Sequence, residues 1–430
     1  MRPGAGRAWP LLLSLAVSLL LAPATGRGEG EVSFRGYVKN FAILLSPPAP
    51  LWEGERTDEP DLGAVMTRLR LGLTLRPSDR FSFSCEYDIS PRLQSTHLFS
   101  EGAFPAGPDA TGYRLMDLRD RIVPGPNGTP TSFAVYQNLD RFSVTIKTRA
   151  ADIVVGRQAV AWGSARVVNP TDVLAPFAFN ELDKEERTGV DAIRVRVPLG
   201  PMDELDIGAV AGHRGFHAAT SAFYLRGKTQ AFDTDVSAVA MAFRRNLLLG
   251  LDLARSIGGA GAWLEAAYVV PQAFAGSEEK EPRYFRASAG LDYNFGPKTY
   301  GFVEYHFSSA GAKEPGSYLG LAGAMPFRAG AVYLLGRHYL SLGGTYQITP
   351  LLPFTGLVIA NLGDLSFVLA PSLELNLSQD VYLAGGAYLG LGKTPEYLAP
   401  PPAPGSRPDL LRSEFGSYPD MVYASFRIYF

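Results

Sequence analysis

The chain has only one cysteine, Cys85, among its 430 residues. A single thiol excludes an intramolecular disulfide framework, a zinc site built from cysteines and a c-type haem attachment. The chain also lacks an excess of charge of either sign, because 40 Lys and Arg stand against 42 Asp and Glu. Nucleic-acid binders carry a basic excess, so no nucleic-acid partner is expected. We expect no cofactor and no metal.

After its first two dozen residues the chain lacks a long apolar run, so no membrane-spanning helix is predicted there. At the N-terminus, Arg2 and Arg7 precede an apolar run from Leu11 to Leu21, which Ala22-Pro23-Ala24 follows. This order of basic, apolar and small residues is typical of a secretory signal peptide. A run of about 11 residues is too short for a spanning helix, which needs roughly 20. We predict a signal peptide over 1–24 and one exported domain over 25–430.

The rest of the chain alternates between apolar and polar residues with the period of a β-strand. All odd positions of 81–89 are apolar and all even positions are polar. All odd positions of 69–75 are leucine, and Pro77-Ser78-Asp79 predicts the turn between the two segments. Strands of soluble sandwiches have about five or six residues. The alternating segments have about 10 to 13, which matches tilted strands that cross a hydrocarbon layer.

The pattern predicts an all-β protein, a transmembrane antiparallel up-and-down β-barrel of about 18 strands, with 16 as the alternative. The strands are expected at about 31–44, 64–76, 80–90, 133–148, 151–160, 187–198, 203–213, 219–229, 234–245, 247–256, 260–270, 284–295, 299–309, 337–349, 352–361, 364–377, 380–391 and 420–430.

Tight turns and long connections alternate along these strands. The tight turns all follow even-numbered strands, which is typical of a barrel with short periplasmic turns and long extracellular loops. An open edge in hydrocarbon would leave unpaired backbone groups at several kcal/mol each, so the sheet is expected to close. The longer connections all follow odd-numbered strands and lie at about 45–63, 91–132, 161–186, 271–283, 310–336 and 392–419.

The C-terminal segment alternates as well and ends on an aromatic residue, Phe430. It resembles the terminal strand of Gram-negative outer-membrane β-barrel proteins. The resemblance implies that Phe426, Ile428 and Phe430 are an insertion signal for the barrel-assembly machinery. It also implies outer-membrane lipids as partners, and it leaves a homotrimer and a monomer both open.

A second segment resembles a group of poorly characterised outer-membrane porin-like proteins through the pattern G-R-Q…W-G…N-P-T-D. It runs from Gly156 to Gly163 and continues at Asn169-Pro170-Thr171-Asp172. Asn-Pro initiates turns, and Asp172 can cap a short helix. We therefore predict a constriction loop that folds inward over the pore, with an ordinary loop packed on the rim as the alternative. Its residues are expected to be Trp162, Asn169, Pro170 and Asp172.

The polar face of the strands is expected to line water, because a charge that faces lipid near mid-depth costs about 2 to 4 kcal/mol. A barrel of 16 to 18 strands leaves an aqueous channel. The arginines gather in the first half of the chain, which suggests a preference for anions. The predicted pore-lining residues are Arg68, Arg70, Arg141, Lys147, Arg149, Arg157, Arg194, Arg196, Glu265, Asp292 and Glu304.

These features predict a porin-like channel without enzymatic activity, in the outer membrane of a Gram-negative bacterium. It would let small hydrophilic, anionic or zwitterionic solutes diffuse passively. One alternative is a barrel that acts as a scaffold or conduit around a partner protein. Another is a lipid-acting enzyme that uses His306 and Ser308, whose spacing resembles the His-x-Ser of outer-membrane phospholipases. The alternation places both side chains inside the barrel, which argues against that enzyme.

Overall fold

The computed structural model describes residues 30–57, 59–99, 112–118, 121–125, 128, 131–177, 179–276, 281–401 and 408–430. The predicted signal peptide at 1–24 lies outside the described residues. Within them, no helix is long and apolar enough to cross a membrane.

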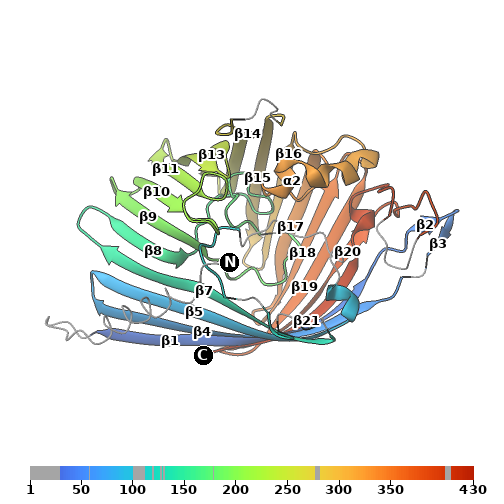
Figure 1. Cartoon of the computed structure of the whole chain (residues 1–430), viewed down its shortest axis with the longest axis horizontal. Coiled ribbons are helices and arrows are strands. Elements are labelled where there is room, and N and C mark those ends of the chain that lie inside the picture. Colours follow the sequence, from blue (N-terminus) through green and yellow to red (C-terminus); the bar gives the residue numbers. More distant parts are fainter. Residues whose placement is uncertain are drawn as a thin grey trace, which may run out of the picture.

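The chain folds into a closed antiparallel β-barrel of 18 strands (Figure 1). Each strand pairs with the next along the chain, and β1 (Glu31–Ser46) pairs with both its successor and the last strand, which closes the ring. The other barrel strands are β4 (Leu62–Ser78), β5 (Phe81–Gln94), β7 (Phe133–Lys147), β8 (Asp152–Gln158), β9 (Val190–Pro198), β10 (Glu204–Val210), β11 (Ala222–Ala231), β12 (Thr234–Phe243), β13 (Asn246–Ile257), β14 (Ala260–Val270), β15 (Tyr284–Gly296), β16 (Thr299–Ser308), β17 (His338–Thr349), β18 (Leu352–Asn361), β19 (Ser366–Ser378), β20 (Val381–Leu391) and β21 (Asp420–Tyr429).

The predicted number and order of the strands are confirmed, and their bounds differ by a few residues. The predicted turn at Pro77-Ser78-Asp79 is shifted, because β4 continues through a bulge to Ser78 and the turn is 79–80. Strand β8 ends at Gln158 and β9 begins only at Val190, since the chain between them turns away from the sheet.

The connections at one rim are all short, and the long ones gather at the opposite rim. The long connections are 47–61, 95–132, 159–189, 211–221, 271–283, 309–337 and 392–419. Two further connections at that rim, 244–245 and 362–365, are short.

The long connections contain the few remaining elements of the described chain. These are the hairpin of β2 (Leu51–Trp52) and β3 (Glu55–Arg56), the short strand β6 (Arg121–Val123), the 3-10 turns η2 (Thr96–Phe99), η3 (Pro315–Gly323) and η4 (Phe415–Ser417), and the helix α2 (Met325–Arg328).

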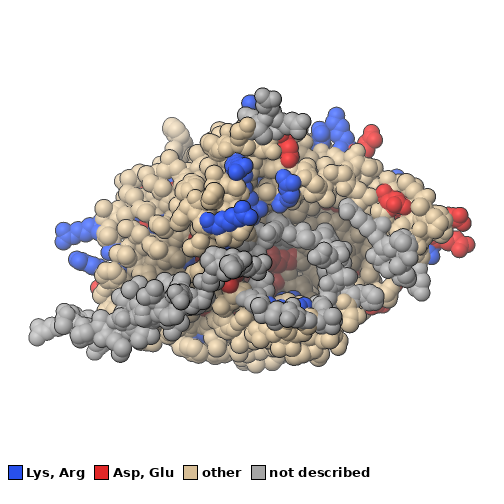
Figure 2. Space-filling view, in the orientation of Figure 1, with Lys and Arg blue, Asp and Glu red and all other residues tan. Residues whose placement is uncertain are grey.

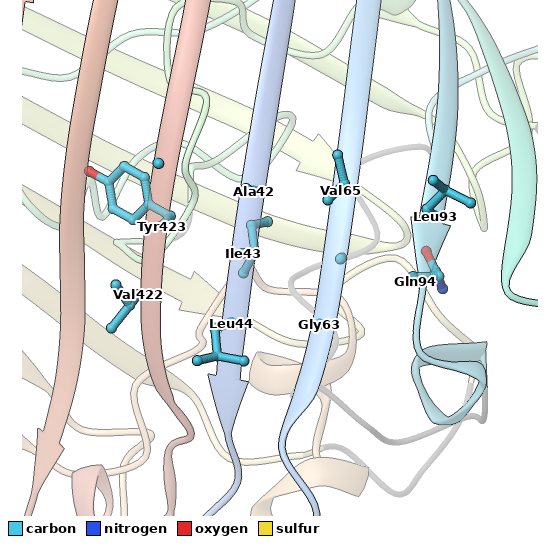
Figure 3. A pocket seen from close by; sticks show the side chains of 11 residues that line it. Ala42, Ile43, Leu44, Gly63, Val65, Leu93, Gln94, Val422 and Tyr423 are labelled. Carbon is cyan, nitrogen blue, oxygen red and sulfur yellow. The ribbon is translucent and has the colours of Figure 1, made fainter.

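The outer face of the barrel is apolar and exposed. Leu249 and Leu251 on β13, for example, are 48% and 40% exposed. Beside the β1–β21 seam, small residues such as Ala42 and Gly63 leave a shallow groove between larger apolar side chains (Figure 3). Such a surface matches acyl chains rather than water.

The inner face carries buried polar and charged side chains. Arg70, Glu265 and Glu304 are all at most 3% exposed. Buried charges must be paired or hydrogen-bonded, so the interior of this barrel is packed with polar contacts. The residues that make these contacts form the candidate site.

Candidate functional site

The connection 159–189, called the inner loop below, folds into the barrel and packs on the wall of β13 to β16. Its Trp162 ring lies 4.9 Å from the ring of Tyr224 on β11. The carbonyl oxygen of Val168 accepts a 2.7 Å hydrogen bond from Ser288 on β15, and that of Pro170 accepts one from Arg286 on the same strand. In Figure 1 the trace of this segment lies in the middle of the ring of strands. The alternative of a loop packed on the rim is therefore wrong for 162–171.

Glu304 on β16 is one of two carboxylates that anchor the inner loop. Its carboxylate accepts backbone N–H groups from Arg166 at 2.6 Å, Val167 at 3.2 Å and Val168 at 3.1 Å. It also accepts the indole N–H of Trp263 at 3.0 Å. Four donors converge on one carboxylate that is 1% exposed, so protein N–H groups take the place of the water that this carboxylate would otherwise bind.

Glu265 on β14 anchors the next turn of the inner loop. It accepts the backbone N–H and the hydroxyl of Thr171 at 2.9 and 2.7 Å, and the side-chain amide of Asn169 at 3.0 Å. Gly163 has a φ of +114°, and a Cβ there would lie 2.6 Å from a carboxylate oxygen of Glu265. Only glycine can take that backbone conformation so close to the carboxylate. Glu265 and Glu304, predicted to line the pore, therefore hold the inner loop and do not face open water.

The second half of the inner loop contacts a different arc of the wall. Lys39 on β1 binds Asp183 at 2.8 Å and Glu185 at 2.7 Å, and Arg427 on β21 binds Glu185 at 3.2 Å. Burial alone would raise the pKa of Glu185, but the hydrogen bonds from Lys39 and Tyr429 outweigh it and lower that pKa. The inner loop thus touches both the β13–β16 wall and the β21–β1 seam, and so crosses the lumen.

Asp172 and Arg187 tie the two halves of the inner loop together. The guanidinium of Arg187 lies 2.9 Å from a carboxylate oxygen of Asp172. No helix forms there, so the expectation that Asp172 caps a helix is wrong; it accepts the N–H of Ala175 at 3.3 Å in a turn. Burial raises the pKa of Asp172, and Arg187 opposes that shift.

The arginines of the early strands do not form a bare basic wall. Arg70 contacts Glu86, Asp88 and Asp140, the last at 2.6 Å, and Arg68 binds Asp88 at 2.8 Å. Each positive charge therefore meets carboxylates on neighbouring strands. Two more arginines are also paired: Arg141 binds Asp140 beside it on β7 at 2.6 Å, and Arg194 on β9 binds Asp206 on β10 at 2.6 Å.

The other predicted lining residues lie in varied places. Arg157 is 4% exposed and bound to Asp117 at 2.9 Å and Asp191 at 2.7 Å, away from open water. Arg196 approaches Asp152 only to 3.8 Å. The rim that carries the short turns exposes two of them, Lys147 at the end of β7 and Arg149 in the following turn.

Arg166 in the first half of the inner loop is a half-exposed cation. Its guanidinium binds Asp292 at 2.7 Å, lies 5.2 Å from the ring of Trp263, and its side chain remains 50% exposed. Tyr300 donates to the same carboxylate at 3.0 Å. Figure 2 shows the molecule hollowed, with acidic and basic side chains visible in the hollow.

His306 and Ser308 do not form a catalytic pair. The Nδ1 atom of His306 lies 2.8 Å from the hydroxyl of Ser288, and the hydroxyl of Ser308 is buried without a hydrogen bond. His306 is 3% exposed, under the inner loop. Among the described residues, no three His, Cys, Asp or Glu side chains are grouped to hold a metal ion.

Sequence reasoning missed the acidic partners. Glu86 and Asp88 on β5 point inward, as do the predicted arginines on β4. Alternation alone could therefore have found these two carboxylates. Asp183 and Glu185 could not be found that way, because loop residues have no strand period.

Comparison with known proteins shows a likeness in fold. No family model and no curated protein matches the chain. Solved structures do match. The outer-membrane protein OccAB2 of Acinetobacter baumannii has a TM-score of 0.53 and 11% identity, over 93% of this chain and 98% of that chain. In fold, the chain is similar to the Occ proteins.

Two further Occ structures carry bound molecules. OccK2 (OpdF) of Pseudomonas aeruginosa, in complex with glucuronate, has a TM-score of 0.53 and 8% identity over 93% of this chain and 98% of that chain. OpdK of the same organism, with vanillate, has a TM-score of 0.50 and 10% identity over the same shares. At such identities the likeness concerns the architecture of the closed barrel.

Proposed function

We propose that the protein is an outer-membrane channel for the passive diffusion of small hydrophilic solutes, with a preference for anionic or zwitterionic ones, and that it is not an enzyme. One observation carries the proposal: a closed barrel has an apolar outer face, a charged inner face and an inner loop that crosses the lumen. Closure leaves no unpaired strand edge in hydrocarbon, and 18 strands enclose an aqueous space.

The preference for anions rests on two supports. Arg166 keeps half of its side chain exposed beside the inner wall. The similar barrels OccK2 and OpdK were solved with glucuronate and vanillate. Because most other arginines are paired with carboxylates, the preference is expected to be modest.

The inner loop also favours a channel over a conduit for a partner protein. A sheathed partner needs an open lumen, whereas contacts to Glu304 and Lys39 hold the loop across it. The same proposal includes export by a signal peptide that is cleaved after about Ala24. It also includes insertion by the assembly machinery and contact with outer-membrane lipids.

Current through single molecules in planar lipid bilayers tests the proposal. We expect steady open steps and, in a potassium chloride gradient, a reversal potential that indicates anion preference. Persistent silence of correctly folded protein would contradict the channel. A strong cation preference would leave the channel standing and overturn the proposed solute charge.

A further inference from the structure

The inner loop covers the wall of β19 to β21 less completely than the wall of β13 to β16, although its Glu185 binds Arg427 and accepts the hydroxyl of Tyr429. On β14 and β16 the inward residues Glu265 and Glu304 are at most 1% exposed. On β20 and β21 the inward tyrosines Tyr382, Tyr423 and Tyr429 remain partly exposed. Figure 2 shows the molecule hollowed in the region where Figure 1 draws β17 to β19, next to this wall. Solutes that pass the inner loop therefore meet tyrosine rings.

Four inward tyrosines form two pairs along this wall, and we call them the tyrosine path: Tyr382, Tyr388, Tyr423 and Tyr429. The rings of Tyr388 and Tyr423 lie 6.3 Å apart at an angle of 31°. Those of Tyr382 and Tyr429 lie 5.8 Å apart at 87°. Tyr423 and Tyr429 are six residues apart on one strand, so the path is about 20 Å long.

The backbone leaves room for these rings. Gly386 on β20 is the register partner of Tyr423, and a Cβ there would lie 2.7 Å from the tyrosine hydroxyl oxygen. Any larger residue at 386 would displace the ring from the wall. The ring of Tyr423 therefore lies across β20 rather than standing free in the lumen.

The charged groups beside the path are paired with one another. Arg427 lies 5.6 Å from the ring of Tyr382 and pairs with Glu374 and Glu185. Paired charges attract ions weakly, whereas the partly exposed tyrosine rings offer flat apolar faces with polar hydroxyls at their edges. The chemistry of this wall thus selects for shape and stacking rather than for net charge.

We propose that the tyrosine path binds solutes built on a six-membered ring, with a flat face that stacks on tyrosine and polar groups at its edge. Aromatic acids and sugars share this chemistry. The inference rests on the proposed channel and deepens it, because it states which solutes the channel retains on their way through.

Two matched pairs of solutes test the path. Benzoate and hexanoate share charge and approximate size, but only benzoate has a ring. Glucose and sorbitol are both uncharged six-carbon compounds rich in hydroxyl groups, but only glucose has a ring. Isothermal titration of the folded protein in detergent and the block of single-channel current both measure binding. We expect at least one ring compound to bind more tightly than its open-chain partner.

The double variant Tyr382→Leu with Tyr423→Leu should weaken that ring binding by roughly 2- to 10-fold per ring and remove the difference within the pair. The matched control is Tyr293→Leu with Tyr346→Leu, because both tyrosines lie on the outer face at 44% and 49% exposure. The control should bind like the wild type. Retarded mobility of unheated protein in a detergent gel confirms that each variant is folded.

The outcomes separate the two proposals. Benzoate alone showing the difference assigns the path to aromatic acids, and glucose alone assigns it to sugars. Equal binding within both pairs, or a double variant that keeps the difference, overturns the tyrosine path. Ring binding in the titration without any current would instead contradict the channel and leave the path in place.

Discussion

Charged residues inside this barrel stabilise the fold only together with their partners of opposite charge. Arg70 is 3% exposed and compensates Glu86, Asp88 and Asp140, which are all at most 4% exposed. Removal of one partner from such a set leaves uncompensated charge in a region of low dielectric. At the rim, Arg76 and Glu31 also form a pair at 2.8 Å, but both side chains are more than half exposed. Water screens the pair at the rim. The same kind of ion pair therefore contributes less stability at the rim than inside the barrel.

Arg70→Leu is expected to destabilise the folded barrel by about 3 to 5 kcal/mol, because three buried carboxylates lose a cation. Arg76→Leu should change stability by at most about 1 kcal/mol. Urea unfolding in detergent or lipid, followed by tryptophan fluorescence, measures both. Equal effects of the two substitutions would contradict the assignment of a buried ion cluster.

Among the elements of the structure, the inner loop has the most influence on the lumen. Its described residues, 159–177 and 179–189, form no strand or helix, and carboxylates of the wall replace the missing backbone partners. A segment held by side chains is easier to release than one held in a sheet, because a single substitution removes several hydrogen bonds together. The width of the passage therefore depends on very few residues.

Glu304→Ala should free the segment around Arg166 and give a larger and noisier single-channel current than the wild type. Three backbone N–H groups lose their acceptor, at a cost of about 1 to 3 kcal/mol for each group that stays buried. Glu204→Ala removes the same charge from the inner face of β10, outside the inner loop, and should leave the current noise unchanged. Identical currents in both variants would show that the loop does not limit conduction.

Two features concern the molecule as a whole, the joining of distant connections and the closure of the ring. Glu414, in the connection before β21, accepts the N–H of Leu335 at 2.8 Å and the amide of Asn361 at 2.8 Å. Tyr339 also donates to Glu414, and the Glu414 N–H donates to Asp364 at 2.7 Å. One buried residue thus joins three connections at the long-loop rim.

Burial raises the pKa of Glu414 from 4.5 to about 7, despite the hydrogen bonds from Tyr339, Leu335 and Asn361. The folded state therefore holds the proton more tightly than the unfolded chain. Its stabilisation is complete below about pH 4.5 and is lost as the pH rises through about 7, by a free energy on the order of 3 kcal/mol. Hydrogen exchange at Leu335 should accelerate from pH 5 to pH 8 by more than the intrinsic chemical rate. Glu414→Gln should follow the intrinsic rate alone; the same excess in that variant would assign it to another group.

The last residue contributes to closure through its backbone. Phe430 and Gly36 exchange two hydrogen bonds, at 2.7 and 2.9 Å. Phe430→Ala keeps both bonds and removes the ring that is predicted, with Phe426 and Ile428, to be the insertion signal. Assembly into liposomes should slow only when the assembly machinery is present. Slower assembly without the machinery would show that the ring acts in packing alone.

Alternation along the chain determined the strands, their faces and the parity of the turns. These are local properties, since a period of two and a turn of a few residues need no knowledge of distant segments. Residues 69–75 and 81–89 therefore predicted a hairpin that the structure contains, with only the turn shifted by a bulge. The same pattern correctly assigned Arg70 and Glu304 to the inner face.

Contacts between distant residues required the folded barrel. Arg166 and Glu304 are 138 positions apart, and Arg70 and Asp140 are 70 apart. Nothing periodic links a loop to the wall that it meets, so the path of the inner loop, its acids Asp183 and Glu185 and the partial exposure of the tyrosines could not be read from alternation. Their positions follow from ring closure, because closure brings strands from opposite ends of the chain around one lumen, where buried charges and backbone groups must find partners.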